Sequence, residues 1–83
     1  MIDLDELDKI AEEIIRELHN WIWFKCQKTA SECVNDLLKL DFDELLEKIG
    51  SHHRKSNFTP YRAYVESQVW LYLLDLRKRL EYM

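Results

Sequence analysis

Residues that form tight turns are scarce in this chain, because its 83 residues include one glycine and one proline. A multi-stranded sheet needs a turn roughly every 8–12 residues, and such turns use glycine and proline heavily. The residues that favour helices, leucine, glutamate, lysine and arginine, are abundant instead. The sequence therefore predicts an all-α protein.

Apolar residues in the N-terminal part recur every three or four positions, as they do on one face of a helix. This spacing predicts a first helix over residues 3–27. The pattern continues to about residue 38, so a second helix either extends the first or follows a short break. Thr29 and Glu32 have the spacing of a capping box, which favours a break near residues 28–29.

Two further pairs of signals mark helix ends. Asp41 and Glu44 repeat the capping-box spacing, and Gly50 is the residue expected just after a helix. Together they predict a short helix over residues 42–49. Thr59 and Pro60 then form a start signal, with threonine as the N-cap and proline in the first turn. A long last helix is predicted from there nearly to the C-terminus.

The last helix carries more apolar surface than one face requires. One stripe is formed by aliphatic and aromatic residues, and Trp70, Leu71 and Leu74 extend over another side. A helix of this type is central in its domain or packs against a second subunit. We expect one domain over residues 1–83, a small bundle of three to four helices that forms a homodimer through the last helix. The alternative is a monomer in which the first two helices clasp the last.

Charge is distributed unevenly along the chain, whose net charge is −4. Residues 1–20 carry seven acids and two bases, whereas residues 51–83 carry six bases and three acids. This polarity suits neutralisation within the chain or binding of partners with opposite charge.

The two cysteines, Cys26 and Cys33, are seven positions apart. On one continuous helix their Cα atoms would be roughly 10.5 Å apart, which exceeds the reach of a disulfide. We therefore expect reduced thiols and a cytoplasmic location. The sequence also predicts no signal peptide and no membrane-spanning helix.

Patterns typical of catalytic and cofactor sites are missing from the sequence. A single glycine excludes a glycine-rich phosphate loop. Cys26 could act as a nucleophile only with a general base beside it, and no sequence motif indicates one. His19, Cys26 and Cys33 follow one another at intervals of about two helical turns, too far apart for one ion. We expect no enzyme activity, no cofactor and no metal, and adjacent histidines alone are a weak metal signal.

An aromatic segment ends the predicted first helix. Trp21 continues the apolar stripe of that helix, whereas Trp23 points away from it because successive residues diverge by about 100°. Tryptophan is enriched at interface hot spots. We predict that Trp21, Trp23 and Phe24 bind a partner protein, and the alternative is that another helix or a second subunit covers Trp23.

A basic loop over residues 51–62 precedes the last helix, whose N-terminus carries unpaired N–H groups and partial positive charge. An anion is well accommodated at such a place. The predicted anion-binding residues are His52, His53, Arg54, Lys55, Tyr61 and Arg62. The alternative is a solvated loop, or one neutralised by the acidic first helix of the same chain.

These features favour a non-enzymatic regulator or inhibitor that binds another protein. Short, aromatic-rich chains with polarised charge are typical of such proteins, including phage-borne ones. The proposed contact uses the aromatic anchors, with the acidic first helix or the basic loop steering the approach. The alternative function is nucleic-acid binding by the basic loop and the start of the last helix, although a pI near 5.3 is low for a duplex binder.

Overall fold

The computed structural model describes residues 4–54 and 61–82, which form four α-helices and one π-helical turn. These elements are α1 (Leu4–Asn20), η1 (Trp21–Lys25), α2 (Ala30–Leu38), α3 (Phe42–Ile49) and α4 (Arg62–Glu81). No strand occurs within the described residues. The predicted all-α bundle with a long C-terminal helix is therefore confirmed.

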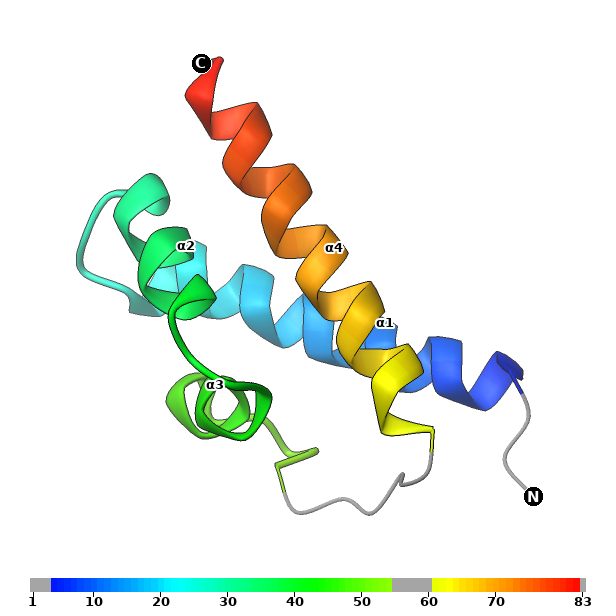
Figure 1. The fold of residues 1–83 in the computed structure, drawn as a ribbon. Coiled ribbons are helices and arrows are strands. Elements are labelled where there is room, and N and C mark those ends of the chain that lie inside the picture. The colour runs from blue at the N-terminus through cyan, green and yellow to red at the C-terminus, as the bar shows by residue number, and fades with distance from the viewer. Residues whose placement is uncertain (1–3, 55–60, 83) are drawn as a thin grey trace.

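The two long helices, α1 and α4, cross each other, and α2 and α3 lie to one side of the crossing (Figure 1). All four helices contribute to one hydrophobic core. Its fully buried side chains include Ile14 and Leu18 of α1, Leu37 of α2, Leu45 of α3 and Leu73 of α4. Burial of this apolar surface is the main source of stability in a domain of this size.

The capping signals of α2 and α3 form as predicted. The Thr29 hydroxyl accepts a hydrogen bond from the Glu32 N–H at 3.2 Å. Asp41 and Glu44 form a reciprocal capping box with distances of 2.8 and 3.0 Å. Gly50 ends α3 with a φ of 65°, in the left-handed region that glycine adopts without strain.

The start of the last helix is only partly covered by the described residues. α4 begins at Arg62, and the predicted start signal at Thr59 and Pro60 lies outside the described residues.

The expectation of reduced cysteines is wrong, because Cys26 and Cys33 form a disulfide. The estimate of their separation assumed one continuous helix. Instead, Cys26 adopts extended backbone angles (φ −77°, ψ 129°), and the chain turns back before Thr29 caps α2. This turn brings the two Cα atoms to 6.4 Å, within disulfide reach. The predicted cytoplasmic location had rested on reduced thiols, and it stays a prediction.

Helix α4 contacts its neighbours mainly through one stripe. Val65, Val69 and Leu73 are fully buried, and the Trp70 ring packs edge-on against Phe42 with centroids 6.3 Å apart. Leu71 and Leu74 remain exposed, by 59% and 42%. None of the helices among the described residues is both long enough and apolar enough to cross a membrane.

Candidate functional site

The chain reverses direction at the end of α3 and places residues 51–54 against α1. Gly50 allows the reversal, and the Ser51 N–H donates to the Leu46 carbonyl at 2.9 Å. Ser51 is completely buried, and its hydroxyl donates a 2.6 Å hydrogen bond to Glu17 Oε1. The His52 N–H donates to the other carboxylate oxygen of Glu17 at 3.0 Å.

The two histidines of the loop meet two carboxylates of α1. Nδ1 of His52 lies 2.9 Å from Glu17 Oε2, and Nε2 of the same ring lies 3.1 Å from Glu13 Oε2. Nε2 of His53 lies 2.6 Å from that same Glu13 oxygen. The two imidazoles contact each other, with ring centroids 4.0 Å apart. We call Glu13, Glu17, Ser51, His52 and His53 the Glu–His cluster.

Helix periodicity explains why the two carboxylates act together. Glu13 and Glu17 are four positions apart on α1, so their side chains project from the same face. His53 is 9% exposed, whereas the His52 side chain is largely open to solvent. The cluster is therefore held against the protein through His53 and is open to solvent at His52.

The pKa values in the cluster shift in the directions that favour opposite charges. The hydrogen bond from His53 is the main cause that lowers the pKa of Glu13. Burial alone raises the pKa of Glu17, but hydrogen bonds from Ser51 and His52 outweigh burial, so that pKa is also lowered. The hydrogen bond with Glu17 raises the pKa of His52 above its ordinary value of 6.5.

Arg62, at the start of α4, contacts carboxylates from two helices. Its Nε donates to Glu66 Oε1 at 3.0 Å, and one Nη donates to Asp43 Oδ1 of α3 at 2.7 Å. The guanidinium also lies 5.2 Å from the centroid of the Phe42 ring. Arg62 therefore joins α3 to α4.

Of the other predicted anion-binding residues, Arg54 and Tyr61 are described, and each contacts its own chain. Arg54 donates to the Ser51 carbonyl at 2.8 Å, and Tyr61 packs against the core. Lys55 lies outside the described residues. His52, His53 and Arg62 all contact carboxylates of their own chain, which is the alternative that the sequence left open. Binding of an external anion stays a prediction.

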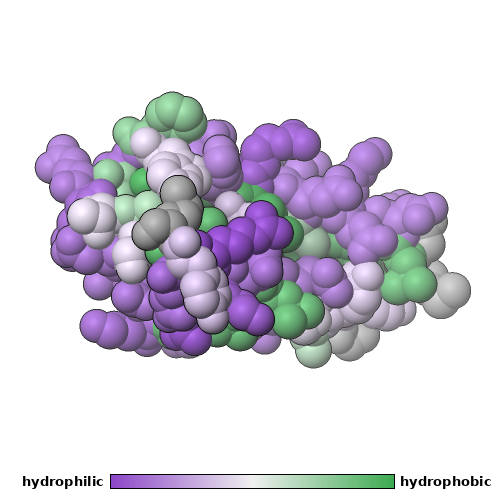
Figure 2. Space-filling model, turned by 90° about the horizontal axis from the view of Figure 1, so that it is seen from above, coloured by the Kyte–Doolittle hydropathy of each residue, from purple (hydrophilic) through white to green (hydrophobic). Residues whose placement is uncertain are grey.

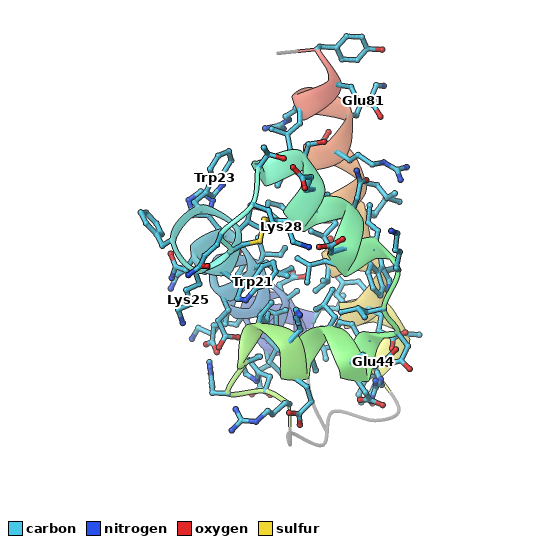
Figure 3. The ribbon with its side chains drawn as sticks, turned by 90° about the vertical axis from the view of Figure 1, so that its left-hand side faces the viewer. Trp21, Trp23, Lys25, Lys28, Glu44 and Glu81 are labelled. Atoms are coloured by element: carbon cyan, nitrogen blue, oxygen red, sulfur yellow. A yellow bond between two sulfur atoms is a disulfide. The ribbon has the colours of Figure 1, made fainter. Side chains whose placement is uncertain are left out.

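The predicted partner-binding aromatics lie on and around the π-helical turn η1. A π-turn closes with a hydrogen bond across five residues, here from the Cys26 N–H to the Trp21 carbonyl at 2.8 Å. Trp21 packs against the core, whereas Trp23 is 44% exposed and Phe24 is 77% exposed. We call Trp23 and Phe24 the aromatic corner. Figure 3 shows Trp23 projecting outward from the turn, with Lys25 on the same side.

A hollow of about 350 Å³ lies beside the aromatic corner, between the end of α1 and α4. The residues that line it are His19, Trp23, Tyr72, Asp75, Leu76 and Arg79. The His19 and Trp23 rings form one wall, with centroids 6.2 Å apart. Arg79 and Asp75 form an ion pair of 2.8 Å on the α4 side.

Comparison with known proteins gives no match to a family model, to a curated protein or to a solved structure.

Sequence reasoning identified His52 and His53 but not their partners, Glu13 and Glu17. The available signal was the spacing of the two glutamates, which places both on one helix face. Seven acids among the first 20 residues made this pair indistinguishable from its neighbours. Only the reversal after Gly50 shows which of them the histidines reach.

Proposed function

We propose that this protein is a non-enzymatic regulator or inhibitor that binds another protein through the aromatic corner. The observation that carries the proposal is the exposure of two adjacent large aromatic side chains on a fixed turn. Phe24 is 77% exposed and Trp23 is 44% exposed, and the turn between them and α2 is closed by a disulfide. Rigid aromatic side chains lose little entropy on binding, which suits them to be interface anchors.

The surroundings of the aromatic corner favour a partner segment that is acidic and carries a large apolar side chain. Arg16, His19 and Trp23 share one side of the N-terminal helix by their spacing, and Lys25 follows Phe24. Cations at the rim of an interface steer an acidic partner toward it. The hollow beside Trp23 offers space for an apolar side chain.

The nucleic-acid alternative has less support from the contacts of the basic loop. Three of its described basic residues, His52, His53 and Arg62, lie against carboxylates of the same chain, and Arg54 donates to the Ser51 carbonyl. A phosphate backbone would have to displace those carboxylates, and the remaining charge would limit the gain.

The proposal is tested by affinity capture from the native host, followed by binding measurements with the purified partner. Phe24→Ala is expected to weaken binding by about 2 kcal/mol, or about thirtyfold, as a hot-spot residue does. Leu4→Ala is the control, because Leu4 is a large apolar residue that is 63% exposed at the start of α1, the end of that helix away from the aromatic corner. Equal binding by both variants, or no partner captured by the wild type, contradicts the proposal.

We further propose that two copies of the chain associate through α4, by way of the exposed Leu71 and Leu74. These residues are three positions apart, so they lie on the same face of the helix. This exposed face differs from the stripe of Val65, Val69 and Leu73, which is buried in the core of the same chain.

A further inference from the structure

Three potential metal ligands converge in the Glu–His cluster. A carboxylate oxygen of Glu13 and one ring nitrogen each of His52 and His53 all lie within 4.8 Å of one another. The Glu13 oxygen lies 3.1 Å from His52 Nε2 and 2.6 Å from His53 Nε2. In a tetrahedral zinc site with bonds of about 2.0–2.1 Å, neighbouring ligand atoms are roughly 3.3 Å apart. The Glu13 oxygen therefore needs to move away from each histidine nitrogen by less than an ångström to reach this spacing.

The residues behind these ligands hold them in the orientation that a metal requires. Nδ1 of His52 lies 2.9 Å from Glu17 Oε2, which favours the tautomer with its proton on Nδ1. When an ion binds, Nε2 of His52 loses its proton and presents a lone pair to the ion beside Glu13. A histidine bonded through its second nitrogen to a carboxylate is the usual arrangement in metal sites.

Ser51 fixes the position of both the loop and Glu17. Its buried hydroxyl donates to Glu17 and accepts the His53 N–H at 3.1 Å. The backbone of His52 donates to Glu17 as well. Two adjacent histidines are thus aimed at one point by contacts that do not depend on an ion.

We propose that Glu13, His52 and His53 bind a divalent transition-metal ion of the zinc type, with Glu17 positioning His52. Two imidazoles and one carboxylate suit Zn²⁺ better than Mg²⁺ or Ca²⁺, which prefer oxygen ligands alone. The exposed side of His52 leaves a fourth position open to water. The ion ties residues 51–54 to α1, which are about 40 positions apart in sequence.

The charge of the cluster is consistent with this ion. Glu13 and Glu17 supply two negative charges close to one point, and the histidines must be neutral to ligate. The cysteines do not compete in the oxidised protein, because both are used in the disulfide. This site is separate from the aromatic corner, so the proposal does not depend on the proposed function.

The test is calorimetric titration of ZnCl₂ into the oxidised, chelator-treated full chain at neutral pH without reductant. One ion per chain is expected, together with a rise in the thermal midpoint when Zn²⁺ is present. His52→Ala and Glu13→Gln are each expected to lower the affinity at least about tenfold, and Glu17→Gln by about 10–100-fold. His52 is exposed, so the His52→Ala variant is expected to fold, and circular dichroism checks this.

His19→Ala is the matched control, since His19 is an exposed histidine outside the cluster. It is expected to retain the wild-type stoichiometry and an affinity within about twofold. Co²⁺ gives an independent readout, because its visible absorption reports tetrahedral coordination. The proposal is overturned if no zinc binds, if zinc binds equally to His52→Ala and Glu13→Gln, or if His19→Ala abolishes binding.

Discussion

The Ser51 hydroxyl connects Glu17 of α1 to the backbone of His53 in the Glu–His cluster. Substitution of Ser51 therefore measures how much this connection contributes to stability. In Ser51→Ala, a partly buried Glu17 oxygen and the buried His53 N–H both lose their hydrogen bond with the Ser51 hydroxyl. A group left unsatisfied in this way costs about 1–3 kcal/mol, so the free energy of unfolding is expected to fall by that amount.

The measurement is urea unfolding followed by circular dichroism. Ser67→Ala is the control, because the Ser67 hydroxyl donates only to the Tyr64 carbonyl at an exposed position. That variant is expected to stay within about 0.5 kcal/mol of the wild type. If the two substitutions lowered the free energy of unfolding equally, the hydrogen bonds of Ser51 would contribute no more to stability than an exposed serine does.

The pH dependence of stability in the metal-free protein follows from the same residues. The pKa of His52 is raised above 6.5, so its contribution is complete below that pH and is lost as pH rises through the folded value. The pKa values of Glu13 and Glu17 are lowered from 4.5, so their contribution is present above that pH and is lost in acid. The cluster therefore stabilises the fold most between pH 4.5 and 6.5.

Urea unfolding of the wild type and of His52→Gln, with a chelator present, measures this dependence. The difference in free energy between the two is expected to shrink as pH rises above 6.5. Glu17→Gln removes the carboxylate nearest His52 and is expected to flatten the profile. A difference that grows with pH would contradict the assignment.

At the residue scale, the sequence identified the basic residues but not their contacts. His52, His53 and Arg62 were predicted to accept an anion, and each lies against a carboxylate of the chain. Long-range pairing of this kind depends on the direction in which the loop leaves α3. Composition and spacing contain no information on that direction.

At the scale of elements, helix ends were predictable because their signals are local. Thr29, Asp41 and Gly50 each act on the backbone within a few residues of themselves. The disulfide was not predictable from spacing, because it depends on the break at Cys26. The π-turn η1 before that break has no established sequence signal, and within it Ile22 is buried whereas Trp23 and Phe24 are exposed.

Reduction of the disulfide tests how far it holds this turn. Closing a loop of this length lowers the entropy of the unfolded chain by an amount equivalent to about 2–3 kcal/mol. The reduced wild type is therefore expected to unfold at a lower urea concentration, with a change in tryptophan fluorescence from the aromatic corner. Cys26→Ala/Cys33→Ala is the second variant, and it should respond no further to reductant. A reduced wild type as stable as the oxidised protein would show that the turn is held by packing alone.

At the scale of the whole molecule, α4 has two apolar sides with different environments. Leu73 is fully buried in the core, whereas Leu71 is 59% exposed two positions earlier on the same helix. Leu73→Ala is expected to lower the free energy of unfolding by about 2–5 kcal/mol. Leu71→Ala, the same chemical change, is expected to cost less than about 0.5 kcal/mol in dilute protein. Comparable losses in dilute solution would mean that the two sides are buried alike.

The exposed side of α4 is also where self-association is expected. The molecule is elongated, with dimensions of 41 × 23 × 19 Å, and the C-terminal turns of α4 extend past α2 (Figure 1). Figure 2, viewed from that end, shows hydrophobic residues in separate groups among hydrophilic ones. A contact centred on two leucines, Leu71 and Leu74, buries limited area, so the dimer is expected to be weak and dependent on concentration.

Light scattering over a dilution series measures this equilibrium. The wild type is expected to have the mass of a dimer at high concentration and of a monomer on dilution. Leu71→Lys places a charge on the proposed contact and is expected to remain monomeric throughout, because an unpaired charge in an interface is costly. Leu4→Lys is the control, since Leu4 is 63% exposed at the start of α1. A wild type that is monomeric at every concentration contradicts the proposed dimer. A dimer that persists in Leu71→Lys but not in Leu4→Lys places the contact at the N-terminal end of α1 instead.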